Sequence, residues 1–159
     1  MAKMLELCGD FPDVDFAPGE VFLHENKTTD KLFVLSQGAV EVFRGDVTVA
    51  VVTEPGSIFG EMSLLLGIPH TASVRAASPA KLRVVPNAMT YLADHPSMLV
   101  PIAQLLARRL QSSTTYLVDL KHQFQHRSDH FGMVDEVLES LSHQQHDDFT
   151  SGADLPPEP

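Results

Sequence analysis

The residues best suited to binding chemistry lie in one stretch, residues 55–76. A Pro-Gly turn there leads into a short apolar run ending at Phe59, and Gly60 and Glu61 follow. A glycine lets the backbone come close to a bound group. A helix that begins after it has N–H groups without helical acceptors, and these suit an anion. Because the Glu61 carboxylate can accept a hydroxyl proton, segment 55–76 predicts a ligand with both an anionic group and a hydroxyl.

The secondary structure of segment 55–76 follows from its helix breakers. Residues 62–66 form an apolar run of one or two helical turns, which Gly67 and Pro69 end. An alternating strand is expected over residues 71–75. The segment therefore predicts a strand, a glycine, a short helix and a second strand.

Segment 55–76 resembles the phosphate-binding cassette of cyclic nucleotide-binding domains, where Phe-Gly-Glu precedes a short apolar helix and Pro-Arg-Ser/Thr-Ala precedes a strand. The corresponding residues here are Phe59, Gly60, Glu61, Met62 and Ser63, and then Pro69, His70, Thr71 and Ala72. The similarity runs in order over residues 16–111. It implies a double-stranded β-helix, that is, a jelly-roll-like β-roll, followed by C-terminal helices.

The same resemblance implies roles for single residues. Glu61 and the Gly60 backbone would hold the ribose 2′-hydroxyl, and Thr71 would contact the cyclic phosphate or the base. The family's phosphate-binding arginine belongs at position 70, where this chain has His70. A histidine is mostly neutral near pH 7, so we expect weakened binding that improves as the pH falls, or none. Strand alternation places Arg75 elsewhere, so it is not a replacement.

Length, charge and cysteine content narrow the function classes. A chain of 159 residues supports one domain with an appended helical segment. Its net charge of −10 argues against a nucleic-acid partner, which needs a Lys/Arg surface. No apolar run approaches the ~20 residues that cross a membrane. Cys8 is the single cysteine, which suits a cytoplasmic protein with a reduced thiol.

Residues 10–96 show short β-type runs separated by turn residues, which is typical of a sandwich or barrel. The predicted fold class is therefore α+β, mainly β. Arg44, Gly45 and Asp46 lie between two β-branched runs and indicate a hairpin turn. That turn explains the three residues better than an adhesion tripeptide does. The period changes near Asn87, which can cap a helix ending at residues 95–96.

A long helix is predicted over residues 97–127. Apolar residues and one serine repeat along it at steps of three and four: Leu99, Ile102, Leu106, Leu110, Ser113, Leu117, Leu120 and Phe124. We call this set the long-helix stripe. A helix of this length extends past a small β domain, so we expect a symmetric homodimer through Ile102 to Phe124.

Residues 107–115 resemble the dimer helix of the family's transcription-factor branch, in which a Thr-Ser pair contacts adenine from both subunits. By position, Ser113 and Thr114 would take these roles. The alternative is that both are small residues at a close helix crossing, and the sequence leaves the two interpretations open.

The C-terminal part predicts a short amphipathic helix over residues 128–142 and a disordered acidic tail over 143–159. His122, His126 and His130 are spaced four apart, and His143 and His146 follow. Imidazoles one turn apart can bind zinc, but a solvated face is the favoured interpretation. We therefore expect no metal site and no cofactor.

The sequence as a whole predicts a regulatory module that binds cyclic AMP or cyclic GMP. No nucleophile elbow, P-loop or Cys/His arrangement tied to a local motif supports an enzyme. Few residues follow the long helix, so we expect no catalytic or DNA-binding output domain and an unknown protein partner instead. The alternative is a dimeric scaffold for protein–protein interaction in which His70 has impaired nucleotide binding.

Overall fold

The computed structural model describes residues 2–124 and 132–147. The chain divides into two compact units, Met1–Leu105 and Leu106–Pro159. The first unit holds all the strands among the described residues, and the second holds most of the long helix and a further helix.

The first unit follows the predicted order of strands and helices. Its elements are α1 (Ala2–Leu7), β1 (Asp13–Phe16), β2 (Val21–Leu23), β3 (Lys31–Gln37), β4 (Val40–Arg44), β5 (Val47–Val52), β6 (Ile58–Phe59), α2 (Glu61–Leu66), β7 (Ser73–Ala76), β8 (Ala80–Pro86), α3 (Ala88–Asp94) and the 3₁₀ helix η1 (Pro96–Met98). The helix α4 (Leu99–Gln123) begins in this unit. The hairpin turn predicted at residues 44–46 joins β4 to β5, with Gly45 at φ 58°.

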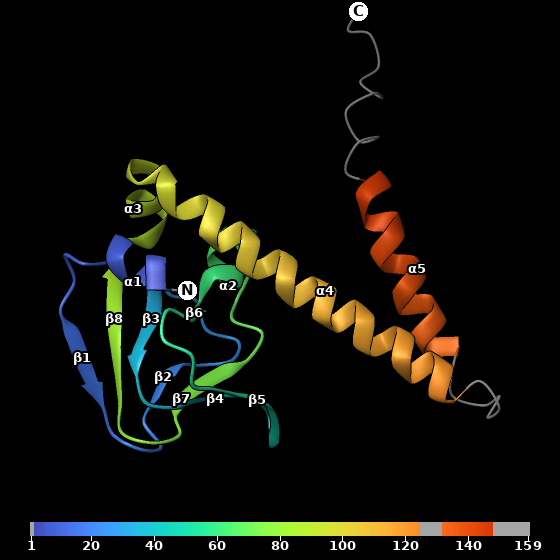
Figure 1. Ribbon diagram of the computed structural model, residues 1–159, viewed down its shortest axis with the longest axis horizontal. Coiled ribbons are helices and arrows are strands. Elements are labelled where there is room, and N and C mark those ends of the chain that lie inside the picture. Colours follow the sequence, from blue (N-terminus) through green and yellow to red (C-terminus); the bar gives the residue numbers. More distant parts are fainter. Residues whose placement is uncertain (1, 125–131, 148–159) are drawn as a thin grey trace, which may run out of the picture. The chain divides into compact units, whose positions relative to one another are not determined.

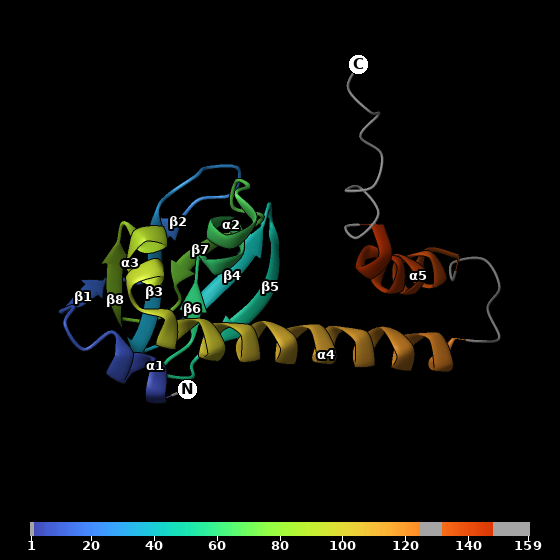
Figure 2. The same cartoon turned by 90° about the horizontal axis from the view of Figure 1, so that it is seen from above.

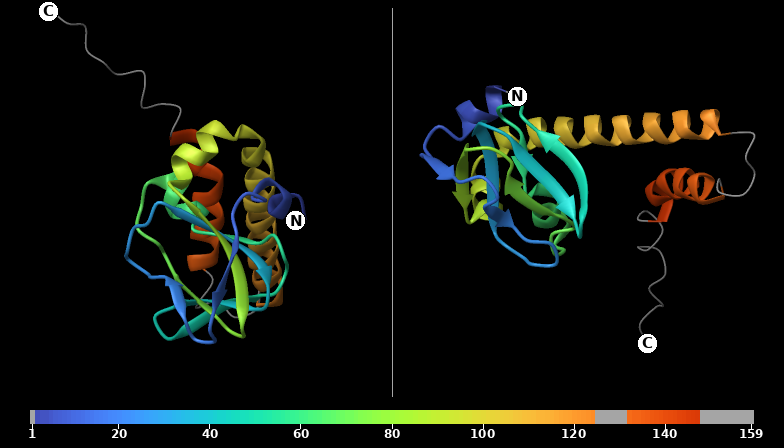
Figure 3. Two further views of the ribbon diagram at one scale, coloured as in Figure 1. Left: turned by 90° about the vertical axis from the view of Figure 1, so that its left-hand side faces the viewer. Right: turned by 90° about the horizontal axis from the view of Figure 1, so that it is seen from below.

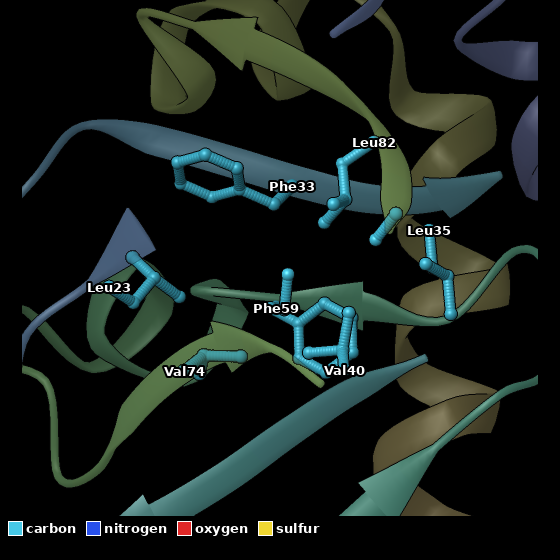
Figure 4. Close-up of a cluster of buried hydrophobic side chains, with 9 residues drawn as sticks. Leu23, Phe33, Leu35, Val40, Phe59, Val74 and Leu82 are labelled. Carbon is cyan, nitrogen blue, oxygen red and sulfur yellow. The ribbon is translucent and has the colours of Figure 1, made fainter. Parts of the chain in front are cut away.

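Two antiparallel four-stranded sheets form the β-roll, in the orders β1-β8-β3-β6 and β2-β7-β4-β5. Figures 1 and 2 show the first sheet and the second from two directions, and Figure 3 shows them from two more. Inner side chains of both sheets meet in one core, in which Phe33, Leu82 and Phe59 face Leu23 and Val74 (Figure 4). The predicted class, mainly β with a jelly-roll-like β-roll and C-terminal helices, is confirmed.

The first unit begins earlier in the chain than the predicted boundary at residue 10. Met4 and Cys8 at the N-terminus are buried, and α1 contacts β3 and η1. The guanidinium of Arg83 on β8 donates to the Leu5 carbonyl near the end of α1. Strand β3 is therefore buried on both faces, by the opposite sheet and by α1.

The C-terminal helices differ from the sequence prediction in their bounds. The long helix α4 runs from Leu99 to Gln123 rather than over 97–127, because Pro96–Met98 form a separate 3₁₀ turn. The predicted helix over 128–142 is α5, which spans Gly132–Asp147. Residues 143–147, predicted as disordered, continue this helix, since no Gly or Pro interrupts the chain before Gly152. Residues 125–131 and 148–159 lie outside the described residues.

Candidate functional site

The junction between β6 and α2 depends on Gly60. Gly60 is the N-cap of α2 and has φ 92°, a left-handed backbone that side chains disfavour. A Cβ added here would lie 2.8 Å from the Lys31 carbonyl oxygen of β3. The sequence predicted that this glycine lets the backbone approach a ligand. In the structure it lets the backbone approach β3, and this contact fixes the start of α2 against the sheet.

The predicted site residues around Gly60 have very different exposures. Phe59 belongs to the core, and Met62 lies on the outer face of α2. Glu61 is only 3% exposed although it can carry a charge. A carboxylate in the first turn of a helix is favoured by the helix dipole. Burying a charged carboxylate is costly unless it is paired, so Glu61 requires a partner at this point.

His70 is 4% exposed and its ring lies between two hydroxyls. The Nδ1 atom is 2.7 Å from Oγ of Ser63 on α2, and Nε2 is 2.9 Å from Oγ1 of Thr29. The Ser63 hydroxyl also lies 3.2 Å from the Gly60 carbonyl, to which it can donate. If it does, Nδ1–H donates to Ser63 and Thr29 donates to Nε2, so every polar atom of the neutral ring is satisfied.

Backbone bonds on both sides hold His70 in this place. The amide of Asn26 donates to the His70 carbonyl at 2.8 Å, and the His70 amide donates to the Lys27 carbonyl at 2.8 Å. The His70 segment therefore runs along the loop between β2 and β3. Thr29 and this loop were missed by the sequence reasoning, because nothing in the local pattern shows which distant segment pairs with residue 70.

Burial changes the predicted chemistry of His70. Removal of the ring from water lowers the pKa of His70 below its ordinary value of 6.5. The imidazole is therefore neutral near pH 7 and engaged with Ser63 and Thr29. The sequence predicted that the ring becomes protonated and pairs with a phosphate as the pH falls just below neutral. Because the pKa is lowered, protonation of the ring requires a more acidic pH than that prediction assumed.

We expect His70 to make folding stability pH-dependent. Because its folded pKa is depressed, the unfolded chain binds a proton at higher pH than the folded chain does. Stability should therefore fall as the pH decreases below about 6.5. His70→Gln should lose part of this dependence. Urea unfolding followed by circular dichroism between pH 8 and pH 5 tests this, and parallel curves for the wild type and His70→Gln would contradict it.

Two charged residues lie beside the next part of the segment. Nε of Arg44, at the end of β4, donates to the Thr71 carbonyl at 2.7 Å. Glu25 accepts from the Gly45 amide at 3.1 Å, and its other carboxylate oxygen is 3.9 Å from Arg44 Nε. Thr71 itself is exposed, and Ala72 is partly buried. The sequence reasoning singled out neither Arg44 nor Glu25 for this site.

Arg75 lies away from this group of residues. Its Nε donates to Glu41 at 2.6 Å, and its guanidinium stacks 4.7 Å from the centre of the Phe43 ring. Hydrogen bonds from Arg75 and Thr48 lower the pKa of Glu41. These contacts show that Arg75 has a structural role on the outer face of the sheet.

The other predicted candidates lie in the second unit. Ser113 is exposed and Thr114 is half-buried, both on α4. The Lys121 ammonium pairs with Asp135 of α5. His122 is exposed, while His126 and His130 lie outside the described residues. Within the described ranges, no group of three or more His, Cys, Asp and Glu side chains could hold a metal.

None of the helices in the described ranges is long and apolar enough to cross a membrane.

Comparisons with known proteins agree with this geometry. Residues 13–90 match the family model for the cyclic nucleotide-binding domain. The CRP-like cAMP-activated global transcriptional regulator of Mycobacterium tuberculosis is 30% identical over 115 residues, which are 67% of this chain and 50% of that protein. The chain thus spans about half the length of this curated relative.

Two solved structures share the fold. A cyclic nucleotide-binding domain from Methylobacillus flagellatus has a TM-score of 0.61 and 24% identity, over 74% of this chain and 82% of that one. The catabolite activator protein of Thermus thermophilus has a TM-score of 0.62 and 20% identity, over 99% of this chain and 88% of that one.

Proposed function

Because the chain belongs to the cyclic nucleotide-binding domain family, we propose that it is a regulatory module whose β-roll binds cyclic AMP or cyclic GMP. The observation that carries this proposal is the junction of β6 and α2. There Gly60 starts α2 against β3, and the buried Glu61 carboxylate follows it directly. A buried carboxylate next to a helix start suits a ligand with a hydroxyl and an anionic group.

The proposal assigns roles along the segment. Glu61 accepts the ribose 2′-hydroxyl, with the Gly60 backbone beside it, and Thr71 and Ala72 lie along the phosphate. Phe59, Met62 and Ser63 form the surrounding wall, and His70 orients Ser63 rather than contacting the phosphate. Ser113 and Thr114 would contact the base from the helix of a dimer.

The proposal also covers how and where the module acts. The module acts in the cytoplasm by binding and not by catalysis, and it passes its signal to a protein partner. The M. tuberculosis relative is named for activation by cyclic AMP, so cyclic AMP is the first ligand to test. The alternative, a dimeric scaffold that does not bind nucleotide, is favoured by one observation: the neutral, buried ring at position 70.

A thermal shift experiment separates these two candidates. Ligand that binds only the folded chain, at a hundredfold excess over its dissociation constant, adds about 2.7 kcal/mol to stability. We therefore expect the melting temperature to rise with cyclic AMP or cyclic GMP and to stay constant with 5′-AMP. An unchanged melting temperature at millimolar concentrations of both cyclic nucleotides would support the scaffold instead.

We also propose that the long-helix stripe forms the interface of a homodimer. Only Ile102 in the stripe is buried in this chain, while Leu110 is 54% exposed and Phe124 is 39% exposed. A second copy would cover these apolar side chains. We expect Leu110→Glu with Leu117→Glu to give a monomer in sedimentation velocity. Gln111→Glu with Thr115→Glu, on the opposite side of the helix, adds the same charge and should remain a dimer. A monomeric unmodified chain at high concentration would contradict the proposal.

A further inference from the structure

The side chain of Arg44 belongs to the inner face of its sheet. Along β4, Val40 is a core residue and Val42 packs against the core, whereas Glu41 and Phe43 meet Arg75 on the outer face. Side chains alternate between faces along a strand. Arg44 therefore shares the inner face with Val40, which Figure 4 shows pointing into the core with Val74 and Leu23.

The sheet register puts Arg44 opposite Ala72. Val42 of β4 pairs with Val74 of β7 in antiparallel register, so the position two residues further along β4 lies beside the position two residues earlier in the other chain segment. The paired residues end at Phe43 and Ser73, so Arg44 and Ala72 are the next positions of the two segments beyond the ladder. The hydrogen bond from Arg44 Nε to the Thr71 carbonyl places the Arg44 side chain at this end of the segment.

Glu25 approaches the same place from the other side. Leu23 of β2 pairs with Val74, and the Glu25 amide donates to Ser73 Oγ at 2.8 Å. Arg44 and Glu25 therefore lie on either side of Ala72, and they form an ion pair at 3.9 Å. The Arg44 side chain is 62% exposed, and only its Nε is used by the Thr71 carbonyl at 2.7 Å.

We propose that Arg44 is the residue that pairs with the phosphate of the bound cyclic nucleotide, and that Glu25 pairs with Arg44 when no ligand is bound. This inference rests on the proposed function and names a specificity-determining residue of the same site. The bond to Thr71 keeps the guanidinium beside the segment, and its outer nitrogens remain able to form a fork with phosphate oxygens. The ligand phosphate exchanges with the Glu25 carboxylate, which is the weaker partner because 3.9 Å is beyond hydrogen-bond distance.

The exchange predicts opposite effects for the two partners. Arg44→Gln should weaken cyclic AMP binding about tenfold, the lower end for a charge-assisted hydrogen bond because the group is exposed. The affinity of Arg44→Lys should fall between those of the wild type and Arg44→Gln, because lysine keeps the charge but lacks the two-pronged guanidinium. Glu25→Gln removes the competing charge while its amide oxygen can still accept from Gly45, so it should tighten binding about threefold.

Isothermal titration of each variant with cyclic AMP at 50 mM and 300 mM NaCl tests the proposal. The wild-type affinity should fall with salt, and the affinity of Arg44→Gln should fall less. Lys81→Gln is the matched control, since Lys81 also forms an exposed ion pair, with Asp15 on the other sheet. It should bind like the wild type.

Several results would overturn the proposal for Arg44. They can be distinguished from the result that would overturn the proposed function. Wild-type affinity and salt dependence in Arg44→Gln would show that another group pairs with the phosphate. A loss of affinity in Lys31→Gln instead would assign the phosphate to Lys31, whose backbone adjoins Gly60. Weakened binding in Glu25→Gln would contradict the exchange. If the folded wild type binds neither cyclic nucleotide, the proposed function itself fails and the inference fails with it.

Discussion

Replacing Gly60 with alanine is expected to destabilise the folded chain by about 2–5 kcal/mol. Gly60 has φ 92°, and a left-handed backbone costs a residue with a Cβ about 1–2 kcal/mol. The new Cβ would also lie 2.8 Å from the Lys31 carbonyl oxygen. That oxygen belongs to the backbone of β3 and cannot move away as a flexible side chain would. The strand or the start of α2 must therefore shift.

Gly67 provides a matched control at the other end of the same helix. It is the C-cap of α2 with φ 65°, and a Cβ there would have no neighbour within 4 Å. Gly67→Ala should cost only the backbone strain, about 1 kcal/mol. Urea unfolding followed by circular dichroism measures both variants. Equal destabilisation of the two would contradict the close approach of Gly60 to β3.

The second large effect is expected at Glu61. Glu61→Gln replaces the buried carboxylate by a neutral amide of the same shape. Losing a hydrogen bond to a charged group costs about 1.5–3 kcal/mol, which corresponds to roughly 10- to 150-fold weaker cyclic nucleotide binding. Isothermal titration at pH 7.5 measures this loss, and Glu6→Gln, the same change at an exposed glutamate of α1, should bind like the wild type.

A ligand without the 2′-hydroxyl isolates the contact proposed for Glu61. Removing this hydroxyl from cyclic AMP should weaken binding to the wild type but change binding to Glu61→Gln much less, since the partner is already lost. Such a cycle separates the direct contact from any effect of the variant on the fold. Equal losses in both proteins would show that Glu61 does not receive the ribose hydroxyl.

The β-roll was predictable because turn-forming residues clearly separate its strands in the sequence. Turn residues at 44–46 and at Gly38 separate β-branched runs, and the structure has strand boundaries at these points. Gly38 has φ 94° and lies directly against Pro79, so its place between β3 and β4 is required by both conformation and space. Segment 55–76 was likewise divided into strand, helix and strand in the right order, because Gly60, Gly67 and Pro69 mark its limits, but its second strand begins at Ser73 rather than at residue 71.

The environment of the site was not predictable, because it depends on pairing between distant segments. The sequence identified His70 but not Thr29, which lies 41 residues earlier and bonds to its ring. It gave no reason to connect Arg44 or Glu25 with Ala72, since only the sheet register brings them together. The burial of α1 was missed for the same reason: a short N-terminal helix has no pattern that shows which surface it covers.

The central claim is that the β-roll binds a cyclic nucleotide, and isothermal titration of the unmodified chain tests it most directly. We expect saturable binding of cyclic AMP or cyclic GMP with one nucleotide per chain, and no competition by 5′-AMP at equal concentration. If a chain shown to be folded by circular dichroism gives no saturable binding of either nucleotide at millimolar concentration, the account of the site is wrong.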